Sequence, residues 1–292
     1  MNRLKLGSAV LISGGTSGLG LNLAYDLTKK GKSVVICGRN LDALHKVMVK
    51  LSEFKKNDQL VLGLVCDVSE ENSVAKMFEM VIDHGLHIET LVCNAGLIGP
   101  INKFLECDRN EWQQAFNVNF FGTLNLINEV LPEMIRRKFG RIIHISGGGA
   151  SSPLYGMSSY AASKIASVRF IETLSLEYKD CGITFNSVAP GMLKTKLLDQ
   201  MLEAGPERIG AALFDKANQK MTADEDATKK VLDLISFLMS DRADLISGKI
   251  ISAEWDNWAE WPNHAEELKA SDIYTLRRIT GRERDSAWGD IQ

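Results

Sequence analysis

Cysteine is scarce in this 292-residue chain, and the arrangement of the five that are present excludes two common kinds of site. They are widely scattered, and no two of them form a Cys-x-x-Cys pair. An odd number at such spacing indicates neither a disulfide framework nor a zinc centre, so we expect no metal site. Most of them stand in or beside apolar runs, where cysteine behaves as a small core residue. Reduced thiols of this kind fit a cytoplasmic protein best.

Long apolar runs and a strong net charge are also lacking. The longest stretch without Asp, Glu, Lys or Arg covers residues 142–163, but it is rich in Gly and Ser and contains His144 and Pro153, so it does not predict a membrane span. The apolar run at residues 9–12 is too short for the core of a signal peptide. A formal net charge of −3 argues against a general binder of nucleic acid or anionic membranes. We therefore expect a small-molecule substrate as partner, with no nucleic acid and no membrane.

Short apolar runs alternate with longer helical patterns along the chain. Such runs separated by helices predict βαβ units and a parallel sheet covered on both faces. Right-handed crossovers then give an α/β fold of the doubly wound Rossmann type, with seven mainly parallel strands. The expected strands are residues 9–12, 33–37, 60–65, 90–93, 141–145, 183–188 and 249–253. The expected helices are residues 19–30, 41–54, 69 or 70 to 84, 109–138 with a break near Pro132, 159–180 and 223–239.

No internal repeat or low-complexity linker divides the chain, so we expect one domain over residues 1–253. Within it, residues 194–221 stand outside the alternation and would form a lid over the substrate. Residues 254–292 form a C-terminal extension rich in tryptophan and arginine, which suits an interface or a carbohydrate or phosphate pocket and suggests a polar, sugar-like substrate. Simple packing would explain its aromatic residues equally well. Those residues are Trp255, Trp258, Trp261, Tyr274 and Trp288.

A glycine-rich turn lies between the first expected strand and the first expected helix. Its glycines, Gly14, Gly18 and Gly20, would let the backbone turn tightly and approach a pyrophosphate, which the helix N-terminus then stabilises. Such a turn alone can simply start a helix. The strand before it and the helix after it favour a dinucleotide site.

Three further motifs follow in order: Asn94-Ala95-Gly96 after the fourth strand, Tyr160-x-x-x-Lys164, and Pro190-Gly191 after the sixth strand. Together with the glycine-rich turn they resemble the short-chain dehydrogenase/reductase family over about residues 5–253. The resemblance implies an NAD(P)-dependent oxidoreductase that transfers hydride between the nicotinamide and a carbonyl or secondary alcohol. It also implies a homodimer or homotetramer formed through the helices near residues 119–138 and 160–178. The implied cofactor-binding residues are Gly14, Thr16, Ser17, Gly18, Leu19, Gly20, Arg39, Asp67, Val68, Asn94, Ala95, Gly96, Tyr160, Lys164, Pro190, Gly191 and Thr195.

The end of the second strand favours NADP, with NAD as the alternative. An NAD-specific site usually carries an acidic residue there, whereas this chain has Gly38 followed by Arg39, which could bind a 2′-phosphate. Arg39 could instead be a solvated loop cation. Ser17 stands where many NADP-preferring relatives carry a second basic residue. Asp67 resembles the family's adenine-contacting aspartate, and its alternative role is a helix cap in competition with Ser69.

The expected reacting groups are Tyr160 and Lys164, which lie four residues apart and so share one face of a helix. A phenol has a pKa near 10, and a nearby ammonium lowers that pKa. By resemblance, Tyr160 is the acid and base, and Lys164 also holds the nicotinamide ribose. Asn119 resembles the family's helix-bending asparagine, which holds a water for proton relay, and Asn117 is the nearby alternative residue for that role. Asn119 could instead be a buried amide that satisfies backbone groups. Thr195, with the loop after Pro190, would hold the nicotinamide carboxamide, unless this loop only ends a strand.

The family's substrate-binding serine is where this sequence departs from the pattern. That serine usually stands thirteen residues before the tyrosine, and here the position is Gly147. Ser146 is one residue away, and a one-residue slip on an extended segment points a side chain the other way. Either the glycine-rich loop presents Ser146, or Ser158 or Ser159 substitutes, or Tyr160 and water hold the substrate oxygen alone. This departure leaves two other possibilities open, a cofactor-binding regulatory or structural protein without catalysis, and an isomerase or lyase with internal redox.

Overall fold

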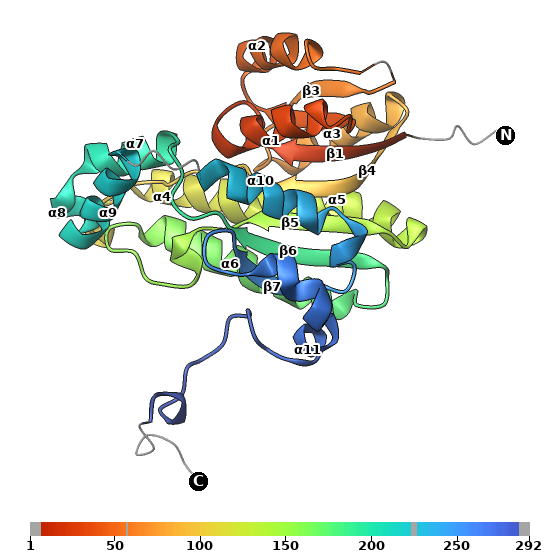
Figure 1. The fold of residues 1–292 in the computed structure, drawn as a ribbon. Coiled ribbons are helices and arrows are strands. Elements are labelled where there is room, and N and C mark those ends of the chain that lie inside the picture. Colours follow the sequence, from red (N-terminus) through yellow and green to blue (C-terminus); the bar gives the residue numbers. More distant parts are fainter. Residues whose placement is uncertain (1–6, 57, 223–226, 286–292) are drawn as a thin grey trace.

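The computed structural model describes residues 7–56, 58–222 and 227–285, and in that part of the chain seven parallel strands form one sheet (Figure 1). Their order is β3-β2-β1-β4-β5-β6-β7, so the direction of winding reverses between β1 and β4. In doubly wound sheets, ligands bind at the carboxyl ends of the strands beside this reversal. The expectation of a seven-stranded doubly wound sheet is confirmed. The strands are β1 (Gly7–Ser13), β2 (Val34–Gly38), β3 (Val61–Val65), β4 (Leu86–Cys93), β5 (Gly140–Ile145), β6 (Ile183–Ala189) and β7 (Lys249–Ser252).

Helices cover both faces of the sheet. On one face α1 (Gly18–Lys29), α2 (Leu41–Ser52) and α10 (Ala227–Leu238) pack their apolar sides against the strands. On the other face α3 (Glu71–Asp83), α5 (Gly122–Arg137) and α6 (Ser158–Glu177) do the same. In α1 the buried leucines 19, 23 and 27 recur every four residues, which is the helical spacing that the sequence shows. The expected start of the last helix at residue 223 lies outside the described residues.

The long helix expected over residues 109–138 is divided at a different place from the one predicted. It consists of α4 (Arg109–Phe116), a π-helical turn η2 (Asn117–Phe121) and α5, which continues through Pro132. The predicted break near Pro132 is therefore wrong. A proline leaves the carbonyl four residues earlier without its helical partner, and here that residue, Asn128, is exposed, so water can satisfy the carbonyl.

Three short helices form the segment that stands outside the alternation. They are α7 (Lys196–Ala204), α8 (Pro206–Ile209) and α9 (Ala211–Thr222), and Figure 1 shows them grouped at one end of the molecule. Met201, Ile209 and Leu213 of this α7–α9 segment share a small apolar cluster with Met157 and Tyr160. This cluster places the segment beside the start of α6.

Most of the described part of the C-terminal extension packs along the edge strand β7. It contains the 3-10 helix η5 (Trp258–His264) and α11 (Ala265–Ala270). The carbonyl of Tyr274 accepts a hydrogen bond from the backbone N–H of Ile250 at 2.8 Å, and the Lys249 ammonium donates to two further carbonyls of the extension at 2.9 Å each. Trp261 is buried, with its ring 4.4 Å from that of Tyr274. The extension thus covers the open edge of the sheet. Trp288 lies outside the described residues.

No helix within the described ranges is long and apolar enough to cross a membrane.

Candidate active site

The glycine-rich turn joins β1 to α1 in a conformation that only glycine adopts easily. Gly14 and Gly18 have φ angles of 66° and 54°, in the left-handed region. A Cβ on Gly20 would stand 2.5 Å from the Asn94 side-chain nitrogen and 2.5 Å from the Gly14 carbonyl oxygen. Asn94 donates to the carbonyls of Ser13 and Gly14 at 2.8 and 3.3 Å, which fixes the end of β4 against the turn. The packed turn leaves the start of α1 free to face a phosphate.

A cavity of about 1440 Å³ opens above this turn and extends to α6 and the α7–α9 segment. Nearly all the residues expected to bind the cofactor line it, together with Ser146. Gly20 and Asn119 do not line it. The residues that line it are Gly14, Thr16, Ser17, Gly18, Leu19, Arg39, Asp67, Val68, Asn94, Ala95, Gly96, Ser146, Tyr160, Lys164, Pro190, Gly191 and Thr195.

The end of β2 leaves little space for a side chain at residue 38. A Cβ on Gly38 would lie 3.2 Å from the Thr16 methyl group, which is closer than most real contacts. The next residue, Arg39, is 57% exposed at its side chain, and its guanidinium lies 4.0 Å from a carboxylate oxygen of Asp67. The other Asp67 carboxylate oxygen accepts hydrogen bonds from the backbone N–H and hydroxyl of Ser69 at 3.0 and 2.7 Å. One cation and one anion therefore face each other at this end of the cavity.

Tyr160 and Lys164 occupy the opposite part of the cavity wall, one turn apart on α6. Burial raises the pKa of the Tyr160 phenol to about 12 and lowers the pKa of the Lys164 ammonium to about 8. The ammonium lies 5.8 Å from the phenol ring centre and donates to the Ile145 carbonyl at 2.7 Å. Among the described residues no hydrogen bond joins the Tyr160 hydroxyl to Lys164, so here burial outweighs the expected lowering of the phenol pKa.

The Asn119 side chain uses both of its N–H donors and accepts one hydrogen bond, all within the wall of the site. Its amide donates to the Leu97 carbonyl at 2.9 Å and to the Ser163 hydroxyl at 2.8 Å, and its side-chain oxygen accepts from the Leu97 N–H at 2.8 Å. The π-helical turn carries this residue and ties the segment after β4 to α6. These bonds fit a buried amide that satisfies backbone groups, and the role of Asn119 in a proton relay stays a prediction.

Gly147 lies directly against the hydroxyl of Tyr160. A Cβ at this position would stand 2.2 Å from the phenol oxygen, so the tyrosine occupies the space that a side chain at residue 147 would take. The neighbouring Ser146 is 2% exposed, and its hydroxyl has no partner in the part of the chain that the structure describes. Gly147 is extended, with φ of −173° and ψ of 168°, and along an extended segment a side chain at residue 147 would point away from the side of Ser146.

The other serines differ in their access to the cavity. Ser158 accepts a hydrogen bond from the Trp112 ring nitrogen at 3.0 Å, and Ser159 donates to the Trp112 carbonyl at 2.6 Å. Both hydroxyls therefore hold α4 against α6. Ser151 and Ser152, which sequence reasoning did not consider, are exposed and line the cavity. They come within reach because the short helix η3 (Gly148–Ala150) turns the chain back after β5.

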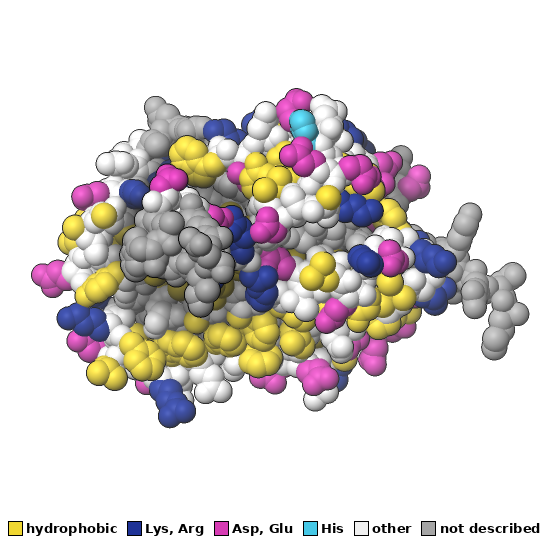
Figure 2. All heavy atoms as spheres, turned by 90° about the horizontal axis from the view of Figure 1, so that it is seen from below, with side chains coloured by type: hydrophobic (Ala, Val, Ile, Leu, Met, Phe, Trp, Pro, Cys, Tyr) yellow, Lys and Arg dark blue, Asp and Glu magenta, His cyan; other side chains and the backbone are white. Residues whose placement is uncertain are grey.

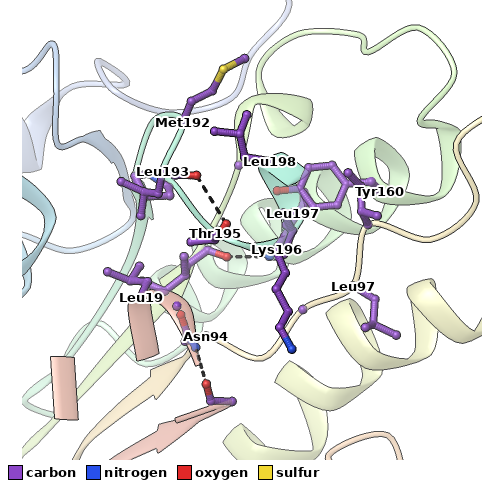
Figure 3. Close-up of a pocket in the computed structure, with 18 of the residues that line it drawn as sticks. Leu19, Asn94, Leu97, Tyr160, Met192, Leu193, Thr195, Lys196, Leu197 and Leu198 are labelled. Carbon is purple, nitrogen blue, oxygen red and sulfur yellow. Dashed lines mark hydrogen bonds between the residues drawn. The ribbon is translucent and has the colours of Figure 1, made fainter. Parts of the chain in front are cut away.

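The loop after β6 closes the cavity beside the glycine-rich turn. Gly191 has a φ of 72°, and the Thr195 methyl group would lie 3.3 Å from a Cβ on Gly18. The Thr195 hydroxyl is 3.5 Å from the Leu193 carbonyl. Figure 3 shows Leu193 and Thr195 in this loop, with Leu19 and Asn94 below them.

The end of the cavity next to Tyr160 is apolar. Figure 3 shows Leu197 and Leu198 of α7 near the Tyr160 ring, with Met192 above them. Two residues of the C-terminal extension also reach the cavity, Glu254 and Trp255, and the latter is 81% exposed. The further apolar lining residues are Leu97, Ile98, Leu154, Met157, Met201 and Leu213.

Comparisons with known proteins agree with this arrangement. The family model described as short chain dehydrogenase matches residues 8–205. The hydroxy(phenyl)methylsuccinyl-CoA dehydrogenase subunit BbsD of Thauera aromatica is 31% identical over 247 residues, covering 82% of this chain and 92% of that protein. The 3-oxoacyl-acyl-carrier-protein reductase MabA of Mycobacterium tuberculosis is 30% identical, covering 84% of this chain and 91% of its own.

A solved structure of actinorhodin polyketide ketoreductase with NADPH superimposes with a TM-score of 0.75 at 25% identity, covering 86% of this chain and 97% of that one. The family match extends over most of the chain and includes the glycine-rich turn, Tyr160 and Lys164. The chain therefore belongs to the short-chain dehydrogenase/reductase family of oxidoreductases, which bind NAD or NADP.

Proposed function

We propose that this enzyme is an NADP(H)-dependent oxidoreductase that interconverts a carbonyl compound and the corresponding secondary alcohol. The observation that carries the proposal is that Tyr160 and Lys164 line the same cavity as the glycine-rich turn. The turn, free of side chains at Gly14 and Gly18, fits the diphosphate of a dinucleotide. When bound, the nicotinamide would accept or supply the hydride.

The protein's own contribution would be the proton. The Tyr160 hydroxyl would hold the substrate oxygen and exchange a proton with it at the phenol oxygen. Burial keeps this phenol protonated near neutral pH, since it raises the pKa to about 12. Lys164, with a pKa of about 8, remains mostly charged at pH 7 and uses one of its three N–H donors on the Ile145 carbonyl. The two remaining donors would be available to ribose hydroxyls.

NADP is the preferred cofactor in this proposal. Gly38 leaves no carboxylate to compete for a ribose 2′-hydroxyl, and Thr16 packs over that position. Arg39, exposed at the rim, would bind the 2′-phosphate, with Asp67 orienting its guanidinium. NAD would lack this charge pairing.

The substrate is proposed to carry an apolar group beside the reacting carbon. The lining near Tyr160 consists of leucine, isoleucine and methionine side chains, and such a surface favours apolar ligands. This supports an apolar substrate over the sugar-like one that the extension's composition suggests. Both relatives are named for acyl groups on a carrier, which supports the same choice.

The test is Tyr160→Phe, assayed with NADPH and NADP against a panel of ketones, 3-oxoacyl thioesters and secondary alcohols. We expect turnover to fall by about 10³-fold or more, because the proton carrier is removed, while NADPH binds within about twofold of wild type. The matched control is Tyr155→Phe, since Tyr155 is exposed and does not line the cavity. Turnover by Tyr160→Phe at the control's rate would refute the mechanism.

One observation favours a second candidate, a cofactor-binding regulatory protein with impaired catalysis. Gly147 supplies no hydroxyl at the family's serine position, and the loss of one such donor costs about 10²- to 10³-fold in rate. In that case wild-type protein would bind NADPH and turn over no member of the panel.

The proposal includes a homodimer or homotetramer in the cytoplasm, formed through the surface of η2, α5 and α6. Phe121, Ile165 and Leu176 expose apolar side chains on those elements. Figure 2 shows apolar side chains gathered in a band along the lower edge of that view.

The five cysteines are free, which suits a reducing compartment.

A further inference from the structure

Three lysines of the α7–α9 segment line the cavity without an acidic partner. They are Lys196 at the start of α7 and Lys216 and Lys220 on α9. None of their ammonium groups forms a hydrogen bond or ion pair with another residue in the ranges that the structure describes. Within the described ranges, therefore, no carboxylate pairs with their positive charges.

The position of each lysine follows from local packing. Lys196 comes directly after Thr195, whose methyl group lies against Gly18 of the glycine-rich turn. Lys216 and Lys220 are four residues apart and so share one face of α9. Ala217, between them, is fully buried, which anchors α9, and both lysines line the cavity. Because α9 packs against α7, all three lysines border the same space.

Three carboxylates line the cavity, those of Asp67, Asp199 and Glu254, and within the described ranges none of them forms an ion pair with these lysines. The α7–α9 segment contributes one carboxylate to the lining, Asp199, and no lysine of the described chain lies within ion-pairing distance of it. The glycine-rich turn offers Ser17 where a basic side chain could stand, and Arg39 already faces Asp67. A cavity wall with three unneutralised cations attracts anions.

We propose that Lys196, Lys216 and Lys220 form a phosphate-binding rim that contacts a phosphate or diphosphate ester from the side opposite the glycine-rich turn. The inference rests on the proposed function in one respect, since it uses the same cavity. Two sources carry this chemistry, the dinucleotide itself and a substrate that bears a phosphate group. In both cases the lysines supply point charges to phosphate oxygens and act in binding.

The experiment compares Lys216→Gln/Lys220→Gln with Lys46→Gln/Lys50→Gln in the full-length chain. The control pair is also four residues apart and exposed, but it lies on α2 and does not line the cavity. Equilibrium dissociation constants are measured for NADPH, NADH and inorganic pyrophosphate by titration calorimetry at low salt. Pyrophosphate is titrated into free protein and into protein saturated with NADPH.

If the dinucleotide is the source, both NADPH and NADH bind about tenfold more weakly to the Lys216/Lys220 variant than to the control, and pyrophosphate competes with NADPH. If a substrate phosphate is the source, the variant binds both dinucleotides as the control does. Pyrophosphate then binds to NADPH-saturated wild type, and it binds about tenfold more weakly to the NADPH-saturated Lys216/Lys220 variant. The proposal is overturned if neither the dinucleotides nor pyrophosphate distinguish the variant from the control. This experiment measures binding and the Tyr160→Phe test measures turnover, so the failure of one can be told apart from the failure of the other.

Discussion

Replacing Gly147 is expected to damage catalysis even when the new residue restores the family's serine. The reason is the 2.2 Å between an added Cβ and the Tyr160 phenol oxygen. Real Cβ contacts begin near 3.0 Å, so the hydroxyl must move by about 1 Å, and a displacement of that size at a reacting group costs about 10²-fold in rate. We therefore expect Gly147→Ala to lower kcat/KM by about 10²-fold, with dinucleotide affinity unchanged within about twofold.

The neighbouring glycine provides the control. A Cβ on Gly148 would meet no atom within 4 Å, and the residue does not need a left-handed backbone, so Gly148→Ala should retain nearly full activity. The assay is the steady-state rate of NADPH oxidation with the best substrate of the panel, together with an NADPH titration of each variant. Gly147→Ser separates two explanations, because it adds the missing hydroxyl and the same Cβ. Higher activity for Gly147→Ser than for wild type would refute the steric reasoning.

Three further predictions concern the cofactor end, the buried lysine and the glycine-rich turn. Arg39→Gln should weaken NADPH about tenfold and leave NADH unchanged in fluorescence titrations, because a charge-assisted bond is lost only from the 2′-phosphate; equal weakening of both would contradict the assignment. Lys164→Met should stabilise the fold at pH 7 by up to about 3 kcal/mol, because the wild-type pKa falls from 10.5 to about 8 on burial. Between pH 8 and 10.5 Lys164 is protonated in the unfolded chain but neutral in the fold, so the free energy of unfolding of wild type rises with pH over that range. The stability difference between Lys164→Met and wild type should therefore disappear by pH 10.5 in urea unfolding. Gly20→Ala should lower stability by about 1–3 kcal/mol and weaken NADPH, because its Cβ would meet Asn94 at 2.5 Å; Gly7→Ala, with its nearest contact at 3.5 Å, should do neither.

The sequence predicts those features of the fold and site that depend on short-range spacing. The alternation of apolar runs and helical patterns, with right-handed crossovers, predicts the doubly wound parallel sheet of seven strands. The spacing of four between Tyr160 and Lys164 predicts that both line one wall, as they do. The strand, glycine-rich turn and helix predict the end of the cavity that we propose binds the diphosphate of the dinucleotide.

The features that the sequence does not reveal depend on contacts between distant segments. The break in the helix expected over residues 109–138 comes at a π-helical turn, where Asn119 bonds to Leu97 and Ser163 rather than at the proline. The position of the Tyr160 hydroxyl against Gly147 arises from the packing of α6 on the loop after β5. The segment expected as a lid after β6 is divided into the helices α7, α8 and α9, and the sequence analysis did not predict that division.

The pKa shifts of Tyr160 and Lys164 determine which of the two groups is protonated near neutral pH. Burial disfavours the charged form of each group. It therefore raises the pKa of Tyr160, whose charged form is the phenolate, and lowers the pKa of Lys164, whose charged form is the ammonium. The two pKa values therefore move apart in opposite directions from a common starting range near 10. Around neutral pH the protonated phenol is the stable state, which equips Tyr160 to donate a proton to a developing alkoxide. Oxidation of an alcohol requires the opposite state, a phenolate. Under the proposed mechanism, the Lys164 ammonium would stabilise that phenolate through the N–H donors that the Ile145 carbonyl does not use.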